Sequence, residues 1–262
     1  MEYNLHDITF LTLVRLDSIM RLENLLLKTQ YMQERFNCKI IILEADSYNR
    51  GIIEKLCLNV DYIFVEDKDN IFHTTKYINM MAERVKTPFL AISGADIIIP
   101  PLQVVDAVEA LRSGSYQFSY PYDGRVLETS EIFRDRFAEM YDCQYLQRNA
   151  NKMTLLKNSA SIKGGAIFAN KQVFIEAGME NERFYGWGAE DDELYYRWQN
   201  LGYKIYRSKG VIFHLTHPRG DNSGYTSAVH KKQAYAELNK TLISTADEIR
   251  ERVEKGYYKV SD

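Results

Sequence analysis

Buried strands and helices alternate through residues 1–100, and this order constrains the fold more than any other feature of the sequence. The runs "DITFLTLV" (7–14) and "CKIIILEA" (38–45) are short and apolar, as strands buried on both faces are. A segment with helical spacing of apolar residues lies between them, over 18–36, with Ser18 as a suitable N-cap. Helices are then expected over 51–59 and 72–85, and strands over 61–67 and 88–100. The alternation predicts an α/β fold with a mostly parallel sheet covered by helices on both faces.

Polar and charged side chains follow these predicted strands where the strands end. Arg15 and Asp17 follow the first strand, Asp46, Tyr48 and Arg50 follow the second, and Asp96 stands in the loop that the fourth strand enters. Ligands of open α/β sheets bind beyond the carboxyl ends of the strands. These six residues are therefore candidates for contact with a ligand.

The stretch after the first strand, "TLVRLDS", contains no glycine-rich phosphate loop. It matches neither G-x-G-x-x-G, which binds dinucleotides, nor the P-loop of nucleotide-binding kinases. We therefore expect neither a nicotinamide-dependent dehydrogenase nor a P-loop kinase. A nucleotide phosphate bound at this edge would need another partner, such as a metal ion.

The composition is ordinary for a globular protein, with 45% hydrophobic and 26% charged residues and a net charge of −3. Without a basic excess, nucleic acid is not expected as a partner. The three cysteines are scattered and form neither a disulfide framework nor a metal knuckle. No signal peptide is evident, and no run approaches the roughly 20 apolar residues of a membrane span. The cytoplasm is the simplest expected location.

The rest of the chain mixes helices and strands less regularly. We expect helices over 100–114, 128–150 and 191–202, a strand followed by a helix over 161–178, and strand-like structure over 204–217. From Thr226 the chain becomes one charged amphipathic helix. Its apolar stripe is thin and its charges are mixed, which favours packing on its own domain over packing on a second subunit or a membrane surface.

Two stretches hold residues suited to a metal ion. "AISGADIIIP" places the carboxylate of Asp96 at the end of a buried strand, and "FHLTHPRGDN" places His214 and His217 three residues apart. Carboxylate oxygen and imidazole nitrogen are both common ligands of divalent metals. Each stretch also has a plainer interpretation. A single Asp more often begins a turn, and two such histidines are as often ordinary loop residues.

The stretch "FYGWGAEDDEL" sets four consecutive acids, 190–193, beside Trp187 and its flanking glycines. The positive end of a helix dipole accounts for one or two of these acids. One of them could serve as a general base, because like charges and an apolar neighbour raise the pKa of an Asp above its reference value of about 3.9. Trp187 could stack on a sugar ring, or it could simply close the core beside a charged helix start.

In this order, the stretches resemble the inverting glycosyltransferases of the GT-A fold. They are most similar to the beta-1,4-galactosyltransferases (family 7, C-terminal type) and to the bacterial family 2 and chondroitin-polymerase-type enzymes. "VRLDSIMRLENL" stands at that family's Arg-containing loop, "SYNRGIIEKLCLNV" at its second-strand segment and "SGADIIIP" at its D-x-D. "IKGGAIFANKQVF" is similar to a Gly-Gly stretch at the acceptor site, and "HLTHPRGDN" to the segment with a metal-binding histidine. "FYGWGAEDDEL" resembles the W-G-G-E-D-D hallmark, which is the specific signal in a resemblance that covers about residues 7–225.

The resemblance implies one domain over 1–262, with a Rossmann-like, mostly parallel sheet. It divides the chain into a nucleotide-binding half (1–100), an acceptor and catalytic half (101–225) and a C-terminal helical tail (226–262). It implies an inverting enzyme that moves a hexose or N-acetylhexosamine from a UDP-sugar donor to a hydroxyl of a saccharide acceptor. The cofactor would be Mn²⁺, with Mg²⁺ as the alternative, because a mixed oxygen and nitrogen shell suits Mn²⁺ better. Surface polysaccharide synthesis follows from the family alone, and any membrane association would be peripheral.

Carried over position by position, the resemblance also assigns roles. Asp191 falls on the catalytic base. Asp46 is added to the nucleotide-binding residues from its place after the second strand. The remaining assignments are acceptor binding for Trp187, Glu190, Asp192, Gly164 and Gly165, nucleotide binding for Arg15, Tyr48 and Arg50, and metal binding for Asp96, His217 and His214.

Two positions depart from the family pattern. Gly94 replaces the first acid of D-x-D, which puts donor affinity or metal dependence in question, and Ala189 replaces the second glycine of W-G-G. Two other functions therefore stay open: a UDP-sugar-binding protein with weak or no catalysis, and a metal-dependent hydrolase that uses Asp96, His214 and His217. The absence of H-E-x-x-H in the sequence weighs against the hydrolase.

Overall fold

The computed structural model describes residues 3–156 and 163–260. Within these residues the main sheet has seven strands, in the order β10-β6-β9-β4-β1-β2-β3. β1 (Tyr3–Val14), β2 (Phe36–Asp46), β3 (Asp61–Glu66) and β4 (Phe89–Ser93) run parallel, and β10 (Ile205–Arg207) is parallel to β6 (Phe118–Tyr120). β9 (Ala166–Asn170) runs antiparallel between β4 and β6. The expected α/β fold with a mostly parallel sheet is confirmed.

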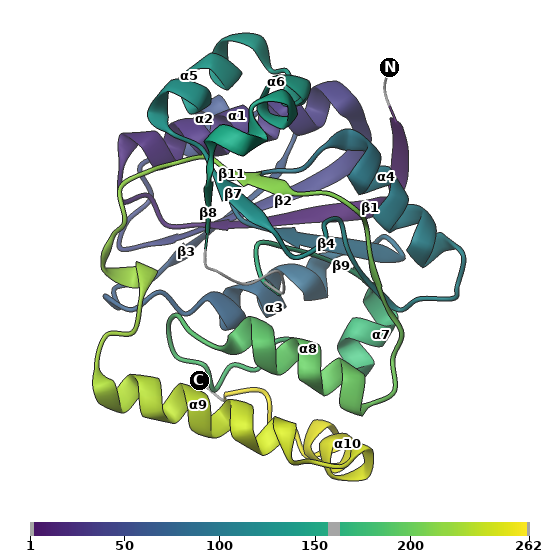
Figure 1. Cartoon of the computed structure of the whole chain (residues 1–262). Helices are drawn as coiled ribbons and strands as arrows, with labels where there is room; N and C mark the ends of the chain where they lie inside the picture. Colours follow the sequence, from purple (N-terminus) through teal and green to yellow (C-terminus); the bar gives the residue numbers. More distant parts are fainter. Residues whose placement is uncertain (1–2, 157–162, 261–262) are drawn as a thin grey trace.

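Helices cover both faces of this sheet (Figure 1). One face carries α1 (Ile19–Arg35), α2 (Ile52–Leu56) and α4 (Pro101–Arg112), and the other carries α3 (Thr74–Arg84), α7 (Lys171–Glu176) and α8 (Glu190–Asn200). The Ser18 side chain caps α1 by accepting a hydrogen bond from the backbone N–H of Arg21, as predicted. The apolar residues of the sheet and of these helices form one continuous core.

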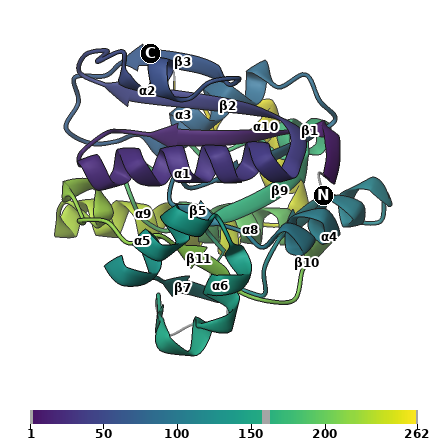
Figure 2. The same cartoon turned by 90° about the horizontal axis from the view of Figure 1, so that it is seen from above.

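A smaller sheet lies beside the main one and carries part of the candidate site (Figure 2). Its four strands within the described residues are β5 (Ile97–Ile98), β11 (Ile212–His214), β7 (Val126–Glu128) and β8 (Thr154–Leu155). Helices α5 (Glu131–Met140) and α6 (Cys143–Arg148) and the 3₁₀ turn η1 (Ala150–Lys152) follow β7. A second apolar cluster joins this region to α1 through Leu27 and Tyr31.

Three predicted elements before the tail differ from the structure. The helix expected over 128–150 is two helices, because Tyr141 adopts a left-handed conformation (φ 50) that ends α5. The strand expected over 88–100 divides into β4 and β5, and the strand-like stretch 204–217 divides into β10 and β11. In both cases the two parts belong to different sheets, separated by a turn around Gly94 or Gly210.

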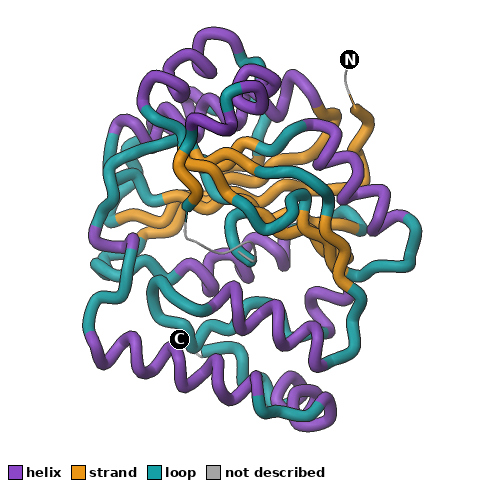
Figure 3. The backbone as a smooth tube through the Cα atoms, viewed as in Figure 1, coloured by secondary structure: helices purple, strands orange, loops and turns teal. Residues whose placement is uncertain are grey.

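The tail packs against α8 (Figure 3). It follows the 3₁₀ turn η2 (Asp221–Ser223) and forms two helices, α9 (Ala228–Leu242) and α10 (Ala246–Glu254), where one was expected. Thr245 begins the second with a capping box. Oγ1 of Thr241 donates to the buried Glu193 carboxylate of α8 at 2.7 Å, and Asn200 donates to the Thr241 carbonyl. Among the described residues, no helix is both long and apolar enough to cross a bilayer.

Candidate functional site

The predicted metal ligands Asp96, His214 and His217 lie together, although they come from two distant segments. Asp96 lies in the turn between β4 and β5, His214 ends β11, and His217 follows shortly after. Nε2 of His217 lies 2.9 Å from Oδ2 of Asp96, and Nε2 of His214 lies 3.5 Å from the same oxygen. One ligand atom from each residue lies within 4.8 Å of the others, and all three residues are buried. This donor set fits a first-row divalent metal, which binds carboxylate and imidazole together.

The surroundings of Asp96 favour its charged form. Burial alone would raise the pKa of its carboxyl, but His214 and His217 outweigh burial and hold that pKa well below its usual range. Arg21, near the start of α1, adds a guanidinium to this surrounding, with Nη1 3.7 Å from Oδ2 of Asp96 and Nη2 3.3 Å from Nδ1 of His217. The carboxylate is therefore ionised and able to bind a cation.

Glu128 is a neighbour of this cluster that the sequence analysis did not single out. It ends β7 and pairs in register with His214 of β11, and its Oε1 lies 3.6 Å from Nδ1 of His214. That Nδ1 is buried without a hydrogen-bond partner in the described part of the chain. A carboxylate beside the second nitrogen of a ligating imidazole commonly orients the ring. Sequence spacing carries no signal for this contact, because it arises from the pairing of two strands.

Gly94, the departure from D-x-D, has a steric reason. A Cβ at this position would lie 2.9 Å from Oδ1 of Asp96 and 3.1 Å from the Ile97 side chain. An acid at position 94 would therefore displace the Asp96 carboxylate or the turn that holds it. The turn accommodates one carboxylate at this edge of the sheet, and that carboxylate is Asp96.

Asp191, the predicted base, lies in the first turn of α8 and against the Gly-Gly stretch. A Cβ at Gly164 would lie only 2.0 Å from Oδ2 of Asp191, so the carboxylate rests on the glycine itself. The hydroxyl of Tyr122 donates to the Gly164 carbonyl, and the backbone N of Gly94 donates to the Gly165 carbonyl at 3.1 Å. The Gly-Gly stretch therefore connects Asp191 to the turn that carries the candidate metal ligand.

The loop around Trp187 requires glycine on both sides. Gly186 (φ +90) and Gly188 (φ +129) occupy backbone conformations that side chains disfavour. A Cβ at Gly188 would lie 2.2 Å from the Tyr225 ring, which packs edge-on against Trp187 with 5.2 Å between ring centroids. Ala189 keeps the left-handed conformation (φ 64), at a cost of roughly 1–2 kcal/mol relative to glycine. Tyr225 is the last residue of the predicted acceptor half, directly before the tail, and was not singled out from the sequence.

The acids on either side of Asp191 have partners in different directions. Oε2 of Glu190 accepts a hydrogen bond from the backbone N of Gly188 at 2.6 Å, which fixes the loop to the helix start. Oδ1 of Asp192 forms a 3.0 Å ion pair with Lys163. Both predicted acceptor-binding acids therefore lie at the amino end of α8, on either side of the predicted base.

The predicted nucleotide-binding residues lie at the ends of β1 and β2. Arg15 pairs with Asp67, which follows β3 and was not singled out from the sequence. Arg50 pairs with Asp46, and its guanidinium lies 4.5 Å from the ring centroid of Tyr48. Tyr48 is 59% exposed and available for stacking. These residues form a second group, beside β1 and β2, along the same carboxyl edge of the sheet.

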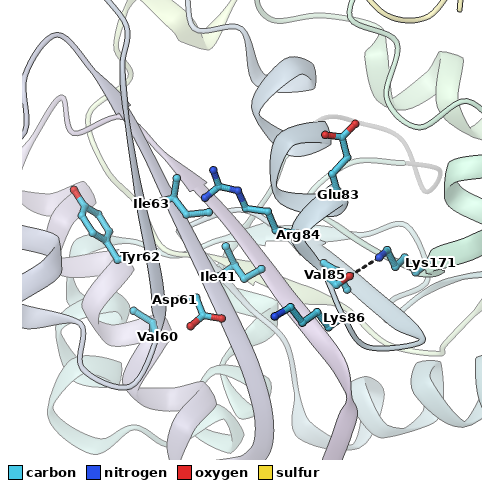
Figure 4. Close-up of a pocket in the computed structure, with 10 residues that line it drawn as sticks. All are labelled: Ile41, Val60, Asp61, Tyr62, Ile63, Glu83, Arg84, Val85, Lys86 and Lys171. Atoms are coloured by element: carbon cyan, nitrogen blue, oxygen red, sulfur yellow. Dashed lines mark hydrogen bonds between the residues drawn. The ribbon is translucent and has the colours of Figure 1, made fainter.

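A hollow of about 890 Å³ lies at the opposite edge, where β3 begins and α3 ends (Figure 4). Its charged lining residues are Asp61, Glu83, Arg84, Lys86 and Lys171. No predicted site residue in the described ranges lines it. The hollow is therefore separate from the candidate site.

Comparison with known sequences gives a match over the site-bearing stretch. Residues 145–220 match the family model described as the N-terminal domain of galactosyltransferase. A segment of 48 residues is 38% identical to beta-1,4-galactosyltransferase 7 of Mus musculus and, equally, of Homo sapiens. This segment is 18% of the chain and spans only 15% of each relative.

Comparison with solved structures covers nearly the whole chain. The mannosyltransferase PcManGT of Pyrobaculum calidifontis, in complex with GDP-Man and Mn²⁺, matches with a TM-score of 0.57 at 12% identity over 96% of this chain and 69% of its own. GalNAc-T7 with UDP, GalNAc and Mn²⁺ matches with a TM-score of 0.59 at 11% identity over 97% of this chain and 55% of its own. Glucosyl-3-phosphoglycerate synthase of Mycobacterium tuberculosis, with Mg²⁺ and UDP, gives 0.54 at 15% identity over 91% and 80%. The chain therefore has the fold of the GT-A glycosyltransferases, and its site-bearing stretch carries the sequence pattern of the galactosyltransferases.

Proposed function

We propose that the chain is an inverting glycosyltransferase that moves a hexose or N-acetylhexosamine from a UDP-sugar to a hydroxyl of a saccharide acceptor. The observation that supports this most strongly is the contact between Asp191 and Gly164. Gly165, the next residue, is hydrogen-bonded to the turn that holds Asp96. The candidate base and the candidate cation site therefore lie at the same edge of the sheet. The galactosyltransferase match over 145–220 and the nucleotide-sugar titles of the structural relatives agree with this chemistry.

In the proposed reaction, the acceptor hydroxyl oxygen attacks the anomeric carbon of the donor sugar from the face opposite the nucleotide. A new glycosidic C–O bond forms, and the bond from the anomeric carbon to the diphosphate oxygen breaks. UDP leaves with the electron pair of that bond, and Asp191 takes the proton of the hydroxyl. Glu190 and Asp192 hold hydroxyl groups of the acceptor, and Trp187 supports the apolar face of its ring.

A cation held by Asp96, His214 and His217 would offset the charge of the departing diphosphate. We propose Mn²⁺, because the ligand set mixes one carboxylate with two imidazoles, and Mg²⁺ as the alternative. Arg15, Asp46, Tyr48 and Arg50 would hold the nucleoside. The likeness to polysaccharide-building families motivates surface polysaccharide synthesis as the biological role, with the enzyme working in the cytoplasm.

Product analysis tests this proposal. The protein is incubated with Mn²⁺, a panel of UDP-sugars and a panel of oligosaccharide acceptors, and both free sugar and extended acceptor are measured. Extended acceptor with the inverted anomeric configuration is the expected result. Free sugar in place of extended acceptor would mean a hydrolase, and donor binding without either product would mean a binding protein.

A further inference from the structure

Three polar residues of α1, namely Arg21, Asn24 and Lys28, have the spacing that aligns side chains on one face of a helix. Asn24 is fully buried, and Lys28 is 3% exposed. Burying such groups is costly unless they find partners. Arg21 also pairs with Asp17, and Asn24 accepts a hydrogen bond from Arg134. Their other partners belong to the two segments that carry the candidate metal ligands, except for Thr12 of β1, which lies beside Lys28.

Asn24 holds the segment that carries the two histidines. Its Nδ2 donates to the carbonyls of Leu215 and Thr216, at 3.0 and 3.2 Å, between the two imidazoles in sequence. The backbone N of Leu215 in turn donates to the carbonyl of Asp96 at 2.8 Å. The histidine segment is therefore fixed to α1 on one side and to the Asp96 turn on the other.

Lys28 holds the turn that carries Asp96. Its ammonium lies 2.9 Å from the Ser93 carbonyl, 2.7 Å from the Ser93 hydroxyl, 2.8 Å from the Gly94 carbonyl and 2.9 Å from the Thr12 hydroxyl. The Gly94 carbonyl also accepts from the backbone N of Ile97, which closes the turn. One buried amino group thus contacts the oxygen atoms of the turn that projects the Asp96 carboxylate.

We propose that Lys28 is a positioning residue for the divalent-cation site, holding the Ser93–Gly94 turn so that Asp96 faces the two histidines. The inference rests on the proposed function, since it assigns to Asp96 the role of a metal ligand. Gly94 is part of the same turn, and its carbonyl is one of the oxygen atoms that Lys28 contacts. A side chain at position 94 would contact the Asp96 carboxylate, and the Lys28 amino group holds the turn from the interior side.

Two physical effects of removing Lys28 oppose each other, which makes the test decisive. Burial lowers the pKa of Lys28 to about 7. Where the amine is protonated, its positive charge repels a nearby divalent cation, so its loss alone would strengthen metal binding. Loss of a positioning contact weakens metal binding, typically by about 10–100-fold for groups that orient ligands. The proposal requires the second effect to exceed the first.

The test is a titration of the full-length protein with Mn²⁺ alone and with Mn²⁺ plus UDP, in which free Mn²⁺ is read by electron paramagnetic resonance. It compares the wild type with Lys28→Met and with Thr29→Val. Thr29 is the matched control, because it is the next residue of α1, is 5% exposed, and has its hydroxyl hydrogen-bonded to the Leu25 carbonyl of its own helix, with the Cys57 thiol as a further neighbour. We expect Lys28→Met to raise the Kd for Mn²⁺ by about 10–100-fold and Thr29→Val to leave it unchanged.

Unchanged or tighter Mn²⁺ binding by folded Lys28→Met would overturn the inference while leaving the proposed function intact. Failure of the wild type to bind Mn²⁺ in either titration would instead overturn the proposed metal site, and the inference with it. If Lys28→Met does not fold, Ser93→Ala replaces it, since this variant removes one of the four acceptors and keeps the ammonium. The proposal then requires Ser93→Ala to raise the Kd for Mn²⁺, but by less than the roughly 10–100-fold expected of Lys28→Met.

Discussion

At the scale of single residues, the candidate base is defined by its contact with a glycine. The Asp191 carboxylate occupies the space that any side chain at position 164 would need. Glu190 and Asp192 flank it, and the buried Glu180 carboxyl lies close enough for Asp191 to influence its ionisation. Substitutions at Asp191, Gly164 and Glu180 each test this arrangement.

The substitution Asp191→Asn removes the proposed proton acceptor and keeps the size of the side chain. We expect the rate of transfer to fall by about 10²–10⁴-fold, because that is the usual contribution of a positioned base. Calorimetry should show unchanged affinity for UDP in the presence of Mn²⁺. Retention of wild-type transfer by this variant would exclude Asp191 as the base.

The substitution Gly164→Ala should displace the same carboxylate, since the new Cβ would lie 2.0 Å from Oδ2 of Asp191. A displacement of about 1 Å can cost about a hundredfold in rate, and we expect a loss of that size in steady-state assays. Gly224→Ala is the control, because position 224 has an extended backbone and nothing within 4 Å of a new Cβ. Equal activities of the two variants would contradict the contact.

Glu180 predicts a pH-dependent stability. Burial raises the pKa of its carboxyl well above the usual range, and Asp191 adds to the effect. As the pH rises above the ordinary Glu pKa, the unfolded chain gives up a proton that the folded protein keeps, so this group's contribution to stability falls until the folded pKa is passed. The Glu180→Gln variant has no carboxyl at this position, so it does not lose this contribution to stability as the pH rises.

Urea unfolding of both proteins between about pH 5 and pH 8 measures this effect. The free energy of unfolding of Glu180→Gln, relative to the wild type, should increase with pH and then level off. A pH-independent difference would show that Glu180 is ionised in the folded protein.

The sequence predicts the candidate ligands and the candidate base, whereas the residues that support them are apparent only in the structure. Asp96, His214 and His217 were predicted as ligands and lie together, because they follow strands whose ends share one region. The contacts of Glu128 and Tyr225 with the site arise from strand pairing and from the return of the tail, and neither leaves a local pattern in the sequence.

At the scale of elements, the tail is part of the support of α8, the helix that carries the candidate base. Glu193 and Arg197 form an ion pair on α8 that is fully buried, and Thr241 of α9 supplies a further hydrogen bond to the Glu193 carboxylate. Arg197 also donates to the carbonyls of Ala177 and Met179, before the Trp187 loop. The orientation of α8 therefore depends on α9.

Thr241→Val should remove the side-chain hydrogen bond that joins α9 to Glu193 of α8. It leaves a buried carboxylate with one hydrogen bond fewer, a change that costs about 1–3 kcal/mol of unfolding free energy. Thr241→Ser keeps the hydroxyl and should retain most of the stability. Thermal or urea unfolding of the three proteins checks this, and equal stability of all three would contradict the coupling.

The elements were predicted well where their apolar period was long and uninterrupted. α1, expected over 18–36, spans Ile19–Arg35, and β2, expected over 38–45, spans Phe36–Asp46. The errors occurred where a single residue changes the backbone direction. Tyr141 divides one predicted helix in two, and the neighbouring Asp142, which caps α6, is the sequence signal for this break that the prediction did not use.

At the scale of the whole molecule, the order of strands and helices was enough to predict a mostly parallel sheet with helices on both faces. The antiparallel insertion of β9 between β4 and β6 could not be predicted, since that pairing joins segments far apart in the chain. This insertion matters for function. It brings the Gly-Gly stretch beside the Asp96 turn and so unites the two parts of the candidate site.

Calorimetric titration with UDP, with and without Mn²⁺, tests the central claim most directly, on the wild type and on His217→Ala. The candidate cation site offers one carboxylate and two imidazoles, so oxygen atoms of the diphosphate should supply further ligands to the metal. We predict UDP binding that requires Mn²⁺ in the wild type and is lost in His217→Ala. UDP binding that depends on neither Mn²⁺ nor His217 would contradict the proposed metal site, and no UDP binding under any condition would contradict the proposed glycosyltransferase function.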